Sequence, residues 1–353
     1  MIRKNLIHVI LLGLAGWSFL TNTVSAQDYY VYVAAESDDE VALLRFDGTN
    51  LEVVKTIEVG TWPNEIEGPH GLNVSPDGEF WYLSIAHGFP YGKVVKYKTG
   101  SDELVQEVEV GLFPATIAIS EATGFLYVVN FNLHGRMTEE SSVSVIETET
   151  MTEIERIPQG IMPHGSRMSP DGLMHYSASM MTGELVEIDA ITLEVVRRLK
   201  TGSDPEGPNP KPTWVTPHPT KPLAFVANNA ANQIAVVDLE KWEIVDHYET
   251  NKGPYNLDIT PDGKLLIVSY KGAASTGVWD LEKGEELALI PNSRAVTHGV
   301  AVTPDGRYAF VSAEGVGGEP GAVDVIDLST KELVASVDVG KQAGGIIFWK
   351  MTE

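Results

Sequence analysis

A short turn phrase, Pro-Asp-Gly, recurs along this chain of 353 residues and sets a period. Complete copies are centred on Asp77, Asp171, Asp262 and Asp305. Degenerate copies stand at 120–124 and 217–222. The spacing is about 42–49 residues, which is typical of propeller blades and too long for most helical solenoids. One apolar segment precedes each turn and three follow it, and their alternation and β-branched residues predict four strands per repeat.

The two ends of the chain complete one further unit. Residues 28–58 supply its second, third and fourth strands, and residues 344–350 supply a first strand with no successor. Pairing these ends predicts seven blades in a ring that the C-terminal strand closes, which removes the open sheet edges. We therefore expect an all-β fold, a seven-bladed β-propeller forming a single domain over residues 27–353.

Several of these phrases, namely FLYVVN, AFVANNAANQIAVVDL and TPDGRYAFVSAEG, resemble the YVTN-type β-propeller repeat family. The likeness covers essentially all of 27–353. It implies a shape shared with propeller lactonases, with the nitrous oxide reductase propeller and with non-catalytic subunits of periplasmic redox complexes. A shared shape of this kind does not settle the activity.

The first 26 residues have the features of a secretory signal peptide. Arg3 and Lys4 precede the apolar run Val9–Ala15, and small residues end at Ala26 before Gln27. We expect residues 1–26 to be removed, and the mature protein to be periplasmic or secreted, with no membrane span.

Composition narrows the classes of cofactor and partner. The chain has no cysteine, which excludes haem c, iron–sulfur clusters and cysteine-based zinc sites. No phosphate-binding loop is present, so we expect no nucleotide. The formal charge is −24, and loss of Arg3 and Lys4 makes it −24 − 2 = −26. Such a surface repels nucleic acid.

Histidine recurs at one point of the repeat, immediately before the first strand. In a propeller the first strands line the central channel, so this position predicts a column at one mouth of the channel, the top face. Around the ring the column reads Ala343, His70, Ala115, His164, Thr213, Tyr255 and His298. The end of the second strand predicts a further column on the same face. That column reads Ser37, His87, Asn132, Met181, Ala230, Gly272 and Gly315, with His134 just beyond it.

Imidazoles and thioethers that converge in space are ligands for copper and, for the imidazoles, zinc. The sequence thus predicts a transition-metal or small-ligand site built on His70, His164 and His298, supported by His87, His134 or Met181. The other interpretation is that these histidines serve turn geometry alone.

Two alternatives remain open from the sequence. A lactonase-like hydrolase is one, with a polar lining supplied by Asn73, Arg167, Tyr255 and Asp258; here Arg167 binds an anionic group and a histidine acts as base. Arg167 and Asp258 would otherwise pair with each other or with backbone groups inside the ring. The other alternative is a metal-free scaffold or accessory subunit of a redox complex. It would bind a protein partner on the top face, where Trp62 and Trp214 lie in long loops.

Overall fold

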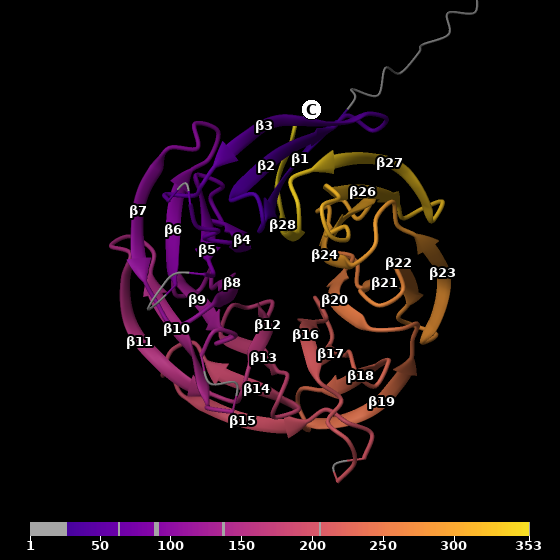
Figure 1. Ribbon diagram of the computed structural model, residues 1–353. Helices are drawn as coiled ribbons and strands as arrows, with labels where there is room; N and C mark the ends of the chain where they lie inside the picture. Colours follow the sequence, from indigo (N-terminus) through magenta and orange to yellow (C-terminus); the bar gives the residue numbers. More distant parts are fainter. Residues whose placement is uncertain (1–26, 63, 88–91, 136–137, 205, 353) are drawn as a thin grey trace, which may run out of the picture.

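The computed structural model describes residues 27–62, 64–87, 92–135, 138–204 and 206–352 (Figure 1). The predicted signal peptide lies outside the described residues. The described chain forms seven four-stranded antiparallel sheets arranged in a ring, so the predicted all-β, seven-bladed propeller is confirmed. No helix long and apolar enough to span a bilayer occurs among the described residues.

The blades are numbered in chain order, with their strands given from the central channel outward. Blade 1 contains β28 (Ala343–Thr352), β1 (Asp28–Ala35), β2 (Glu40–Phe46) and β3 (Leu51–Glu58). Blade 2 contains β4 (Pro69–Val74), β5 (Phe80–Ile85), β6 (Lys93–Lys98) and β7 (Leu104–Glu109). Blade 3 contains β8 (Pro114–Ile119), β9 (Phe125–Asn130), β10 (Ser141–Glu147) and β11 (Thr152–Gln159). Blade 4 contains β12 (Pro163–Met168), β13 (Met174–Ser179), β14 (Glu184–Asp189) and β15 (Val195–Lys200).

The last three blades have the same order. Blade 5 contains β16 (Pro212–Pro217), β17 (Leu223–Asn228), β18 (Gln233–Asp238) and β19 (Glu243–Glu249). Blade 6 contains β20 (Pro254–Ile259), β21 (Leu265–Tyr270), β22 (Ser275–Asp280) and β23 (Glu285–Pro291). Blade 7 contains β24 (Thr297–Val302), β25 (Tyr308–Ala313), β26 (Gly321–Asp327) and β27 (Glu332–Val339).

The ring is closed as the two chain ends predict. The C-terminal strand β28 pairs antiparallel with β1, so that Val33 lies opposite Ile346 and Val31 opposite Phe348. Figure 1 shows β28, in yellow, beside the indigo strands of the N-terminal segment. Because β28 is the innermost strand of blade 1, the start and the end of the chain hold each other in place.

Apolar clusters lie at the interfaces between adjacent blades. One joins blades 1 and 2, where Tyr32 stacks on Trp81 at a centroid distance of 5.1 Å and Trp81 stacks on Tyr97 at 4.1 Å. Middle strands such as β9 are buried on both faces, which explains unbroken apolar runs like FLYVVN. The outermost strands are largely exposed, as in β7, or alternate, as in β15, because one face meets solvent. Burial of these large aromatic rings between sheets is a main source of stability.

The recurring turn phrase closes the hairpin between the first and second strands. Ser75 Oγ donates to Asp77 Oδ1 at 2.5 Å and accepts the backbone N–H of Phe80 at 2.9 Å. Asp77 Oδ1 also accepts the N–H of Glu79 at 3.0 Å. The same bonds recur at Asp171, Asp262 and Asp305. These aspartates are therefore turn residues, as the repeat predicts.

Candidate ligand site at the channel mouth

The phrase Pro-His-Gly has a structural explanation in blade 2. Pro69 pairs with Ile85 and Leu72 pairs with Leu83, so His70 and Gly71 form a bulge between them. A Cβ atom on Gly71 would lie 2.0 Å from the carbonyl oxygen of Ala115 in the next blade, so only glycine fits. Gly165 and Gly299 take the same position in blades 4 and 7. The glycine lets adjacent innermost strands approach, and the histidine before it lies at the channel.

A left-handed residue with a main-chain hydrogen bond recurs just before every innermost strand. The residue before each strand has a positive φ angle, and its carbonyl oxygen accepts the N–H of the residue that follows the second strand. Two of these bonds are Lys271 N–H to Gly253 O, with an N···O distance of 2.9 Å, and Glu36 N–H to Gln342 O at 3.1 Å. The left-handed residues are Gly68, Phe113, Met162, Lys211, Gly253, Val296 and Gln342. Holding non-glycine residues there costs about 1–3 kcal/mol each, which the ring must offset.

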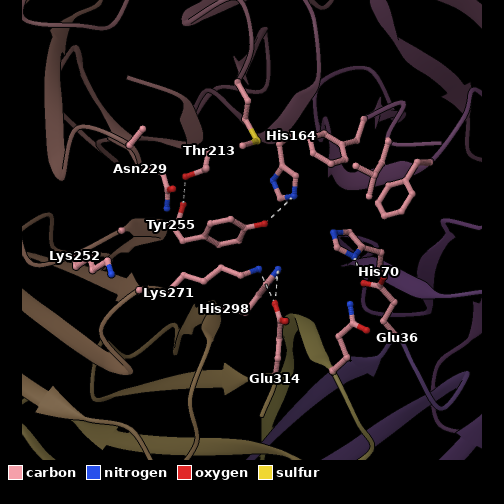
Figure 2. A pocket seen from close by; sticks show the side chains of 18 of the residues that line it. Glu36, His70, His164, Thr213, Asn229, Lys252, Tyr255, Lys271, His298 and Glu314 are labelled. Atoms are coloured by element: carbon pink, nitrogen blue, oxygen red, sulfur yellow. Dashed lines mark hydrogen bonds and ion pairs between the residues drawn. The ribbon is translucent and has the colours of Figure 1, made fainter. Parts of the chain in front are cut away.

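A cavity of about 700 Å³ opens at this mouth of the channel. The first predicted column reaches it, since His70, His164, Thr213, Tyr255 and His298 all line its wall (Figure 2). Their rings lie close together: the His70 centroid is 5.8 Å from those of His164 and His298. The three histidines are thus brought together, as the repeat alignment predicts.

Residues one position earlier than the second predicted column also line the cavity. They are Glu36, Phe131, Met180, Asn229, Lys271 and Glu314. Three of them carry charge that the sequence analysis did not place here. Of the predicted column itself, Ala230 and Gly272 line the cavity as well. At four other strand ends the residue one position earlier faces the cavity instead, because side chains alternate along a strand.

Met181, the predicted sulfur ligand, shows the effect of this one-residue error most clearly. Met181 is 42% exposed and lines a separate hollow, whereas Met180 lies at the cavity beside the histidines. Trp214, predicted as a surface anchor, is buried in β16 with 6% exposure, so that prediction is wrong. Trp62 is 64% exposed.

Lys271 is the cationic centre of the cavity. Its Nζ donates to Glu314 Oε1 at 2.7 Å and lies 4.3 Å from the centroid of the Tyr255 ring. Burial alone would lower the pKa of Lys271, but Tyr255 and Glu314 outweigh burial and raise it, so the ammonium stays charged. Burial raises the pKa of Tyr255, with Lys271 opposing, so this hydroxyl is neutral and able to donate.

Two of the histidines are neutral at physiological pH. Burial holds the pKa of His164 and of His298 well below the ordinary value, and nearby positive groups add to the effect. His164 Nε2 lies 3.0 Å from the Tyr255 hydroxyl. His298 Nε2 lies 3.8 Å from Glu314 Oε1. These imidazoles therefore act as hydrogen-bonding groups.

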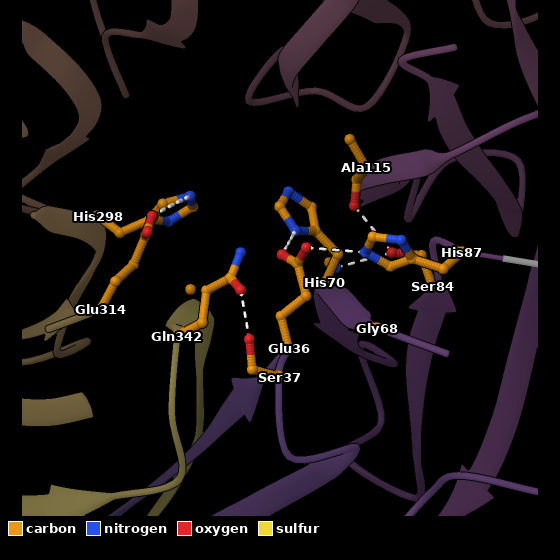
Figure 3. A network of polar contacts seen from close by, with 12 residues as sticks. Glu36, Ser37, Gly68, His70, Ser84, His87, Ala115, His298, Glu314 and Gln342 are labelled. Carbon is orange, nitrogen blue, oxygen red and sulfur yellow. Dashed lines mark hydrogen bonds and ion pairs between the residues drawn. The ribbon is translucent and has the colours of Figure 1, made fainter. Parts of the chain in front are cut away.

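The third histidine ends a hydrogen-bonded row that begins at exposed His134, and Figure 3 shows the inner part of this row, from His87 through Glu36 to His70. Exposed His134 contacts His87, with 2.8 Å between Nε2 and Nδ1. His87 Nε2 lies 3.0 Å from Glu36 Oε1, and Glu36 Oε2 lies 2.8 Å from His70 Nδ1. Burial alone would raise the pKa of Glu36, but its hydrogen bonds to His70 and His87 outweigh burial. The net pKa is therefore lowered, and Glu36 is a carboxylate. With the carboxylate on Nδ1, His70 keeps Nε2 as its acceptor.

The remaining predicted polar residues lie deeper, in a second cavity of about 280 Å³. Asn73, Arg167 and Asp258 line it, and only His70 and His298 are shared with the lining of the mouth cavity. Asn73 is bound to the backbone, since its Nδ2 donates to Ile117 O at 3.0 Å. Tyr255 alone of this predicted set lies at the mouth.

The donor set can be compared with the needs of a metal ion. Within the described parts of the chain, no group of three or more His, Cys, Asp or Glu side chains is arranged to hold one. His70 and His164 each have one ring nitrogen engaged, with Glu36 and Tyr255 respectively. A metal held by all three histidines would require His164 Nε2 to release Tyr255 or the ring to turn. Copper or zinc at this site stays a prediction.

Comparison with known proteins gives one family match and one curated relative. The family model described as "Lactonase, 7-bladed beta-propeller" matches residues 22–152. Antigen Lp49 of Leptospira interrogans serogroup Icterohaemorrhagiae serovar copenhageni (strain Fiocruz L1-130) is 24% identical over 187 residues. The match spans 48% of this chain and 40% of the antigen, so it covers less than half of that relative.

Solved structures match over most of the chain. Kuenenia stuttgartiensis hydrazine synthase aligns with a TM-score of 0.67 and 22% identity, over 82% of this chain and 92% of that one. A functionally unknown protein from Desulfotomaculum acetoxidans DSM 771 aligns with a TM-score of 0.72 and 15% identity, over 91% and 98%. At these identities the likeness shows the fold alone. The chain is a seven-bladed β-propeller, and over residues 22–152 it is similar to the seven-bladed lactonase family.

Proposed function

We propose that this propeller binds a small organic molecule at the channel mouth, one that has an apolar part and a carbonyl or carboxylate group. The supporting observation is the two-sided wall of the mouth cavity. Phe113, Phe131, Leu133 and Met180 form an apolar side from blades 3 and 4 and the segments that flank their strands. Glu36, Tyr255, Lys271 and Glu314 form a polar side from blades 1, 6 and 7 (Figure 2). A concave, mostly apolar site with a few converging polar groups is the usual form of a small-molecule site.

Recognition of the carbonyl or carboxylate falls to two donors. The Lys271 ammonium and the Tyr255 ring are adjacent, and both side chains are held by neighbours before any ligand arrives. The single Tyr255 hydroxyl proton is available to the ligand when His164 Nε2 carries a proton and donates to the Tyr255 oxygen. Preorganised donors lose little conformational freedom on binding, which favours affinity. The Phe131 and Met180 side chains then cover the apolar part of the ligand.

The test uses δ-hexalactone and its ring-opened hydroxy acid as probes, with binding followed by saturation-transfer NMR. We expect Lys271→Met to weaken binding of both probes at least tenfold, and Lys264→Met, which removes an exposed lysine, to leave binding unchanged. A double variant, Lys271→Met with Glu314→Gln, avoids leaving Glu314 without its partner. Equal affinity in all four proteins, or no binding to any, would reject the proposal.

Hydrolysis of a cyclic ester is a second candidate, favoured by the lactonase-family match and by the Glu36–His70 pair. His70 Nε2 would take a proton from water, the resulting hydroxide oxygen would attack the ester carbonyl carbon, and Lys271 would stabilise the oxyanion. Proton return to the ring oxygen then opens the ring. We expect Glu36→Gln to lower kcat by about 10²–10⁴-fold with little change in KM. Turnover unchanged in Glu36→Gln and in His70→Asn would exclude this chemistry while leaving the binding proposal intact.

Export of the mature protein and a protein partner on the top face stay predictions from the sequence. Trp62 is an exposed aromatic side chain available there.

A further inference from the structure

The second cavity, below the histidine layer, contains two opposite charges that do not form a direct bond. Arg167 on β12 and Asp258 on β20 both line this inner chamber of about 280 Å³. In the part of the chain that the structure describes, no ion pair joins them, and Asp258 is nevertheless the charged group that influences Arg167. Of the two pairings that the sequence left open, the direct one is therefore not formed, and each side chain bonds to backbone instead.

Asp258 uses its oxygens to hold backbone. Its Oδ1 accepts the N–H of Ile259 at 2.9 Å, and its Oδ2 accepts the N–H of Val302 in blade 7 at 2.8 Å. These bonds fix the carboxylate at the seam between blades 6 and 7. Each oxygen still has a second lone pair for another donor.

Arg167 is held from a different side. Its Nη1 donates to the carbonyl oxygen of Ser166 at 3.1 Å, and its guanidinium lies over the Trp214 indole at 5.0 Å. Among the described residues, the bond to Ser166 is the one hydrogen bond that the Arg167 guanidinium makes, although a guanidinium has five N–H donors. Stacking on an aromatic face fixes the plane of the fork and leaves its edge able to bind a carboxylate in bidentate fashion.

The rest of the chamber wall is largely apolar. Leu72, Ile117, Val300, Ile346 and Phe348 contribute to it. In such surroundings a separated cation and anion are costly to leave without a partner. A lone carboxylate ligand would satisfy Arg167 but face the Asp258 charge, and a lone amine would satisfy Asp258 but face Arg167.

We propose that the inner chamber binds a small zwitterion with an apolar body, of the α-amino acid type, with its carboxylate on Arg167, its ammonium group on Asp258 and its side chain against the apolar wall. This site is distinct from the channel-mouth site and does not depend on the function proposed there.

The test is isothermal titration calorimetry of the mature chain with three matched probes. They are L-leucine, 4-methylpentanoate, which lacks the ammonium group, and 3-methylbutylamine, which lacks the carboxylate. We expect L-leucine to bind at least tenfold more tightly than either analogue. This comparison uses the unaltered protein, so it does not depend on any variant folding. Absence of leucine binding, or equal binding of 4-methylpentanoate, would overturn the proposal.

Variants then place the ligand. Arg167→Met should weaken leucine binding at least tenfold, while Arg294→Met, which removes a surface arginine, should not. Asp258→Asn should weaken leucine binding but leave 4-methylpentanoate binding unchanged or improved, because one repulsive charge is gone. Circular dichroism checks that each variant is folded. Loss of leucine binding in Lys271→Met but not in Arg167→Met would assign leucine to the mouth cavity and overturn the inner site.

Discussion

At the residue scale, His164 shows how one hydrogen bond can decide between two uses of a site. Its Nε2 contacts the Tyr255 hydroxyl at 3.0 Å, and a metal shared with His70 and His298 would need one of its ring nitrogens. If the predicted copper or zinc site forms, Tyr255→Phe should bind the metal at least tenfold more tightly, because it removes the competing hydroxyl. Metal content by mass spectrometry, after incubation of residues 27–353 with each metal, measures this. A His164→Ala variant is the control that should lose the metal; a metal-free Tyr255→Phe protein would contradict the sequence prediction.

A second residue, His175, is buried on β13 with neither ring nitrogen bonded in the structure. It stacks on Tyr127 at a centroid distance of 4.9 Å, and burial lowers its pKa to about 3. Phenylalanine can keep the stacking without the unbonded nitrogens. We expect His175→Phe to raise the free energy of unfolding by about 1–3 kcal/mol. Urea denaturation measures the change.

His218 supplies the matched control. Its Nδ1 accepts the backbone N–H groups of Thr220 and Lys221, at 3.1 and 3.0 Å. His218→Phe should therefore destabilise the protein, since it leaves these turn donors without an acceptor. If both histidine variants changed stability in the same direction, hydrogen bonding would not be the cause.

At the scale of single elements, the innermost strands depend on their close approach. A Cβ atom on Gly71 would meet the Ala115 carbonyl oxygen at 2.0 Å, which adjacent strands β4 and β8 can relieve only by moving apart. Gly71→Ala should lower the free energy of unfolding by about 3 kcal/mol or more, at or beyond the upper end of overpacking costs. Gly318→Ala is the control, because nothing lies within 4 Å of its added Cβ. Similar denaturation midpoints for the two variants would show that β4 and β8 separate without cost.

The elements also show what the sequence could and could not predict of the site. The first column was placed correctly in blades 2 to 7, where Pro or Gly beside the column residue fixes the frame, although these residues are the second of their strands and do not precede them. In blade 1 it was one residue early, because Ala343 takes the place of Pro69 and Gly344 that of His70. No such signal marks the end of the second strand, and there the frame was set one residue late. Since side chains alternate sides along a strand, that error replaced Glu36 with Ser37 and left Lys271 unnamed, although its neighbour Gly272 also lines the cavity. The left-handed residues that fix the true frame include Val296 and Gln342, which have no turn signature in sequence.

At the scale of the whole molecule, the number of blades and the closure of the ring were predictable from the repeat. The number of turn phrases gives the number of complete units, and the two incomplete chain ends together make up one further blade. The two internal cavities were not predictable, because their separation depends on how the rings of His70 and His298 meet in the channel.

The buried histidines give the whole fold a pH dependence with a definite sign. His164, His175 and His298 have pKa values below 6.5, their ordinary value, so the unfolded chain binds more protons below that pH. Stability should be constant above about pH 6.5 and fall as pH drops, by up to about 1.4 kcal/mol per pH unit for each histidine. Glu36 adds to the loss of stability once pH falls below 4.5, the ordinary pKa of a glutamate, because its pKa in the folded protein is depressed.

Denaturant titrations between pH 7.5 and 4 measure the slope of stability against pH, and His175→Phe should reduce this slope by the contribution of one histidine. A stability that rises on acidification would contradict this assignment.

Because of the left-handed residue before each innermost strand, different atoms hold the strand entrance in place and contact a ligand in the channel. Main-chain atoms, the carbonyl of that residue and the amide after the second strand, fix the entrance of each blade to the channel. Most side chains at that rim are consequently not needed for this bond, although Thr213 and Asn229 also join blade 5 to backbone of blade 6. Each blade can present a different pair of chemical groups to the channel, such as Tyr255 with Lys271 in one and His164 with Met180 in another, on an unchanged frame. The mouth is thus a circular array of interchangeable positions, and exchanging its side chains should alter what it binds far more than whether it folds.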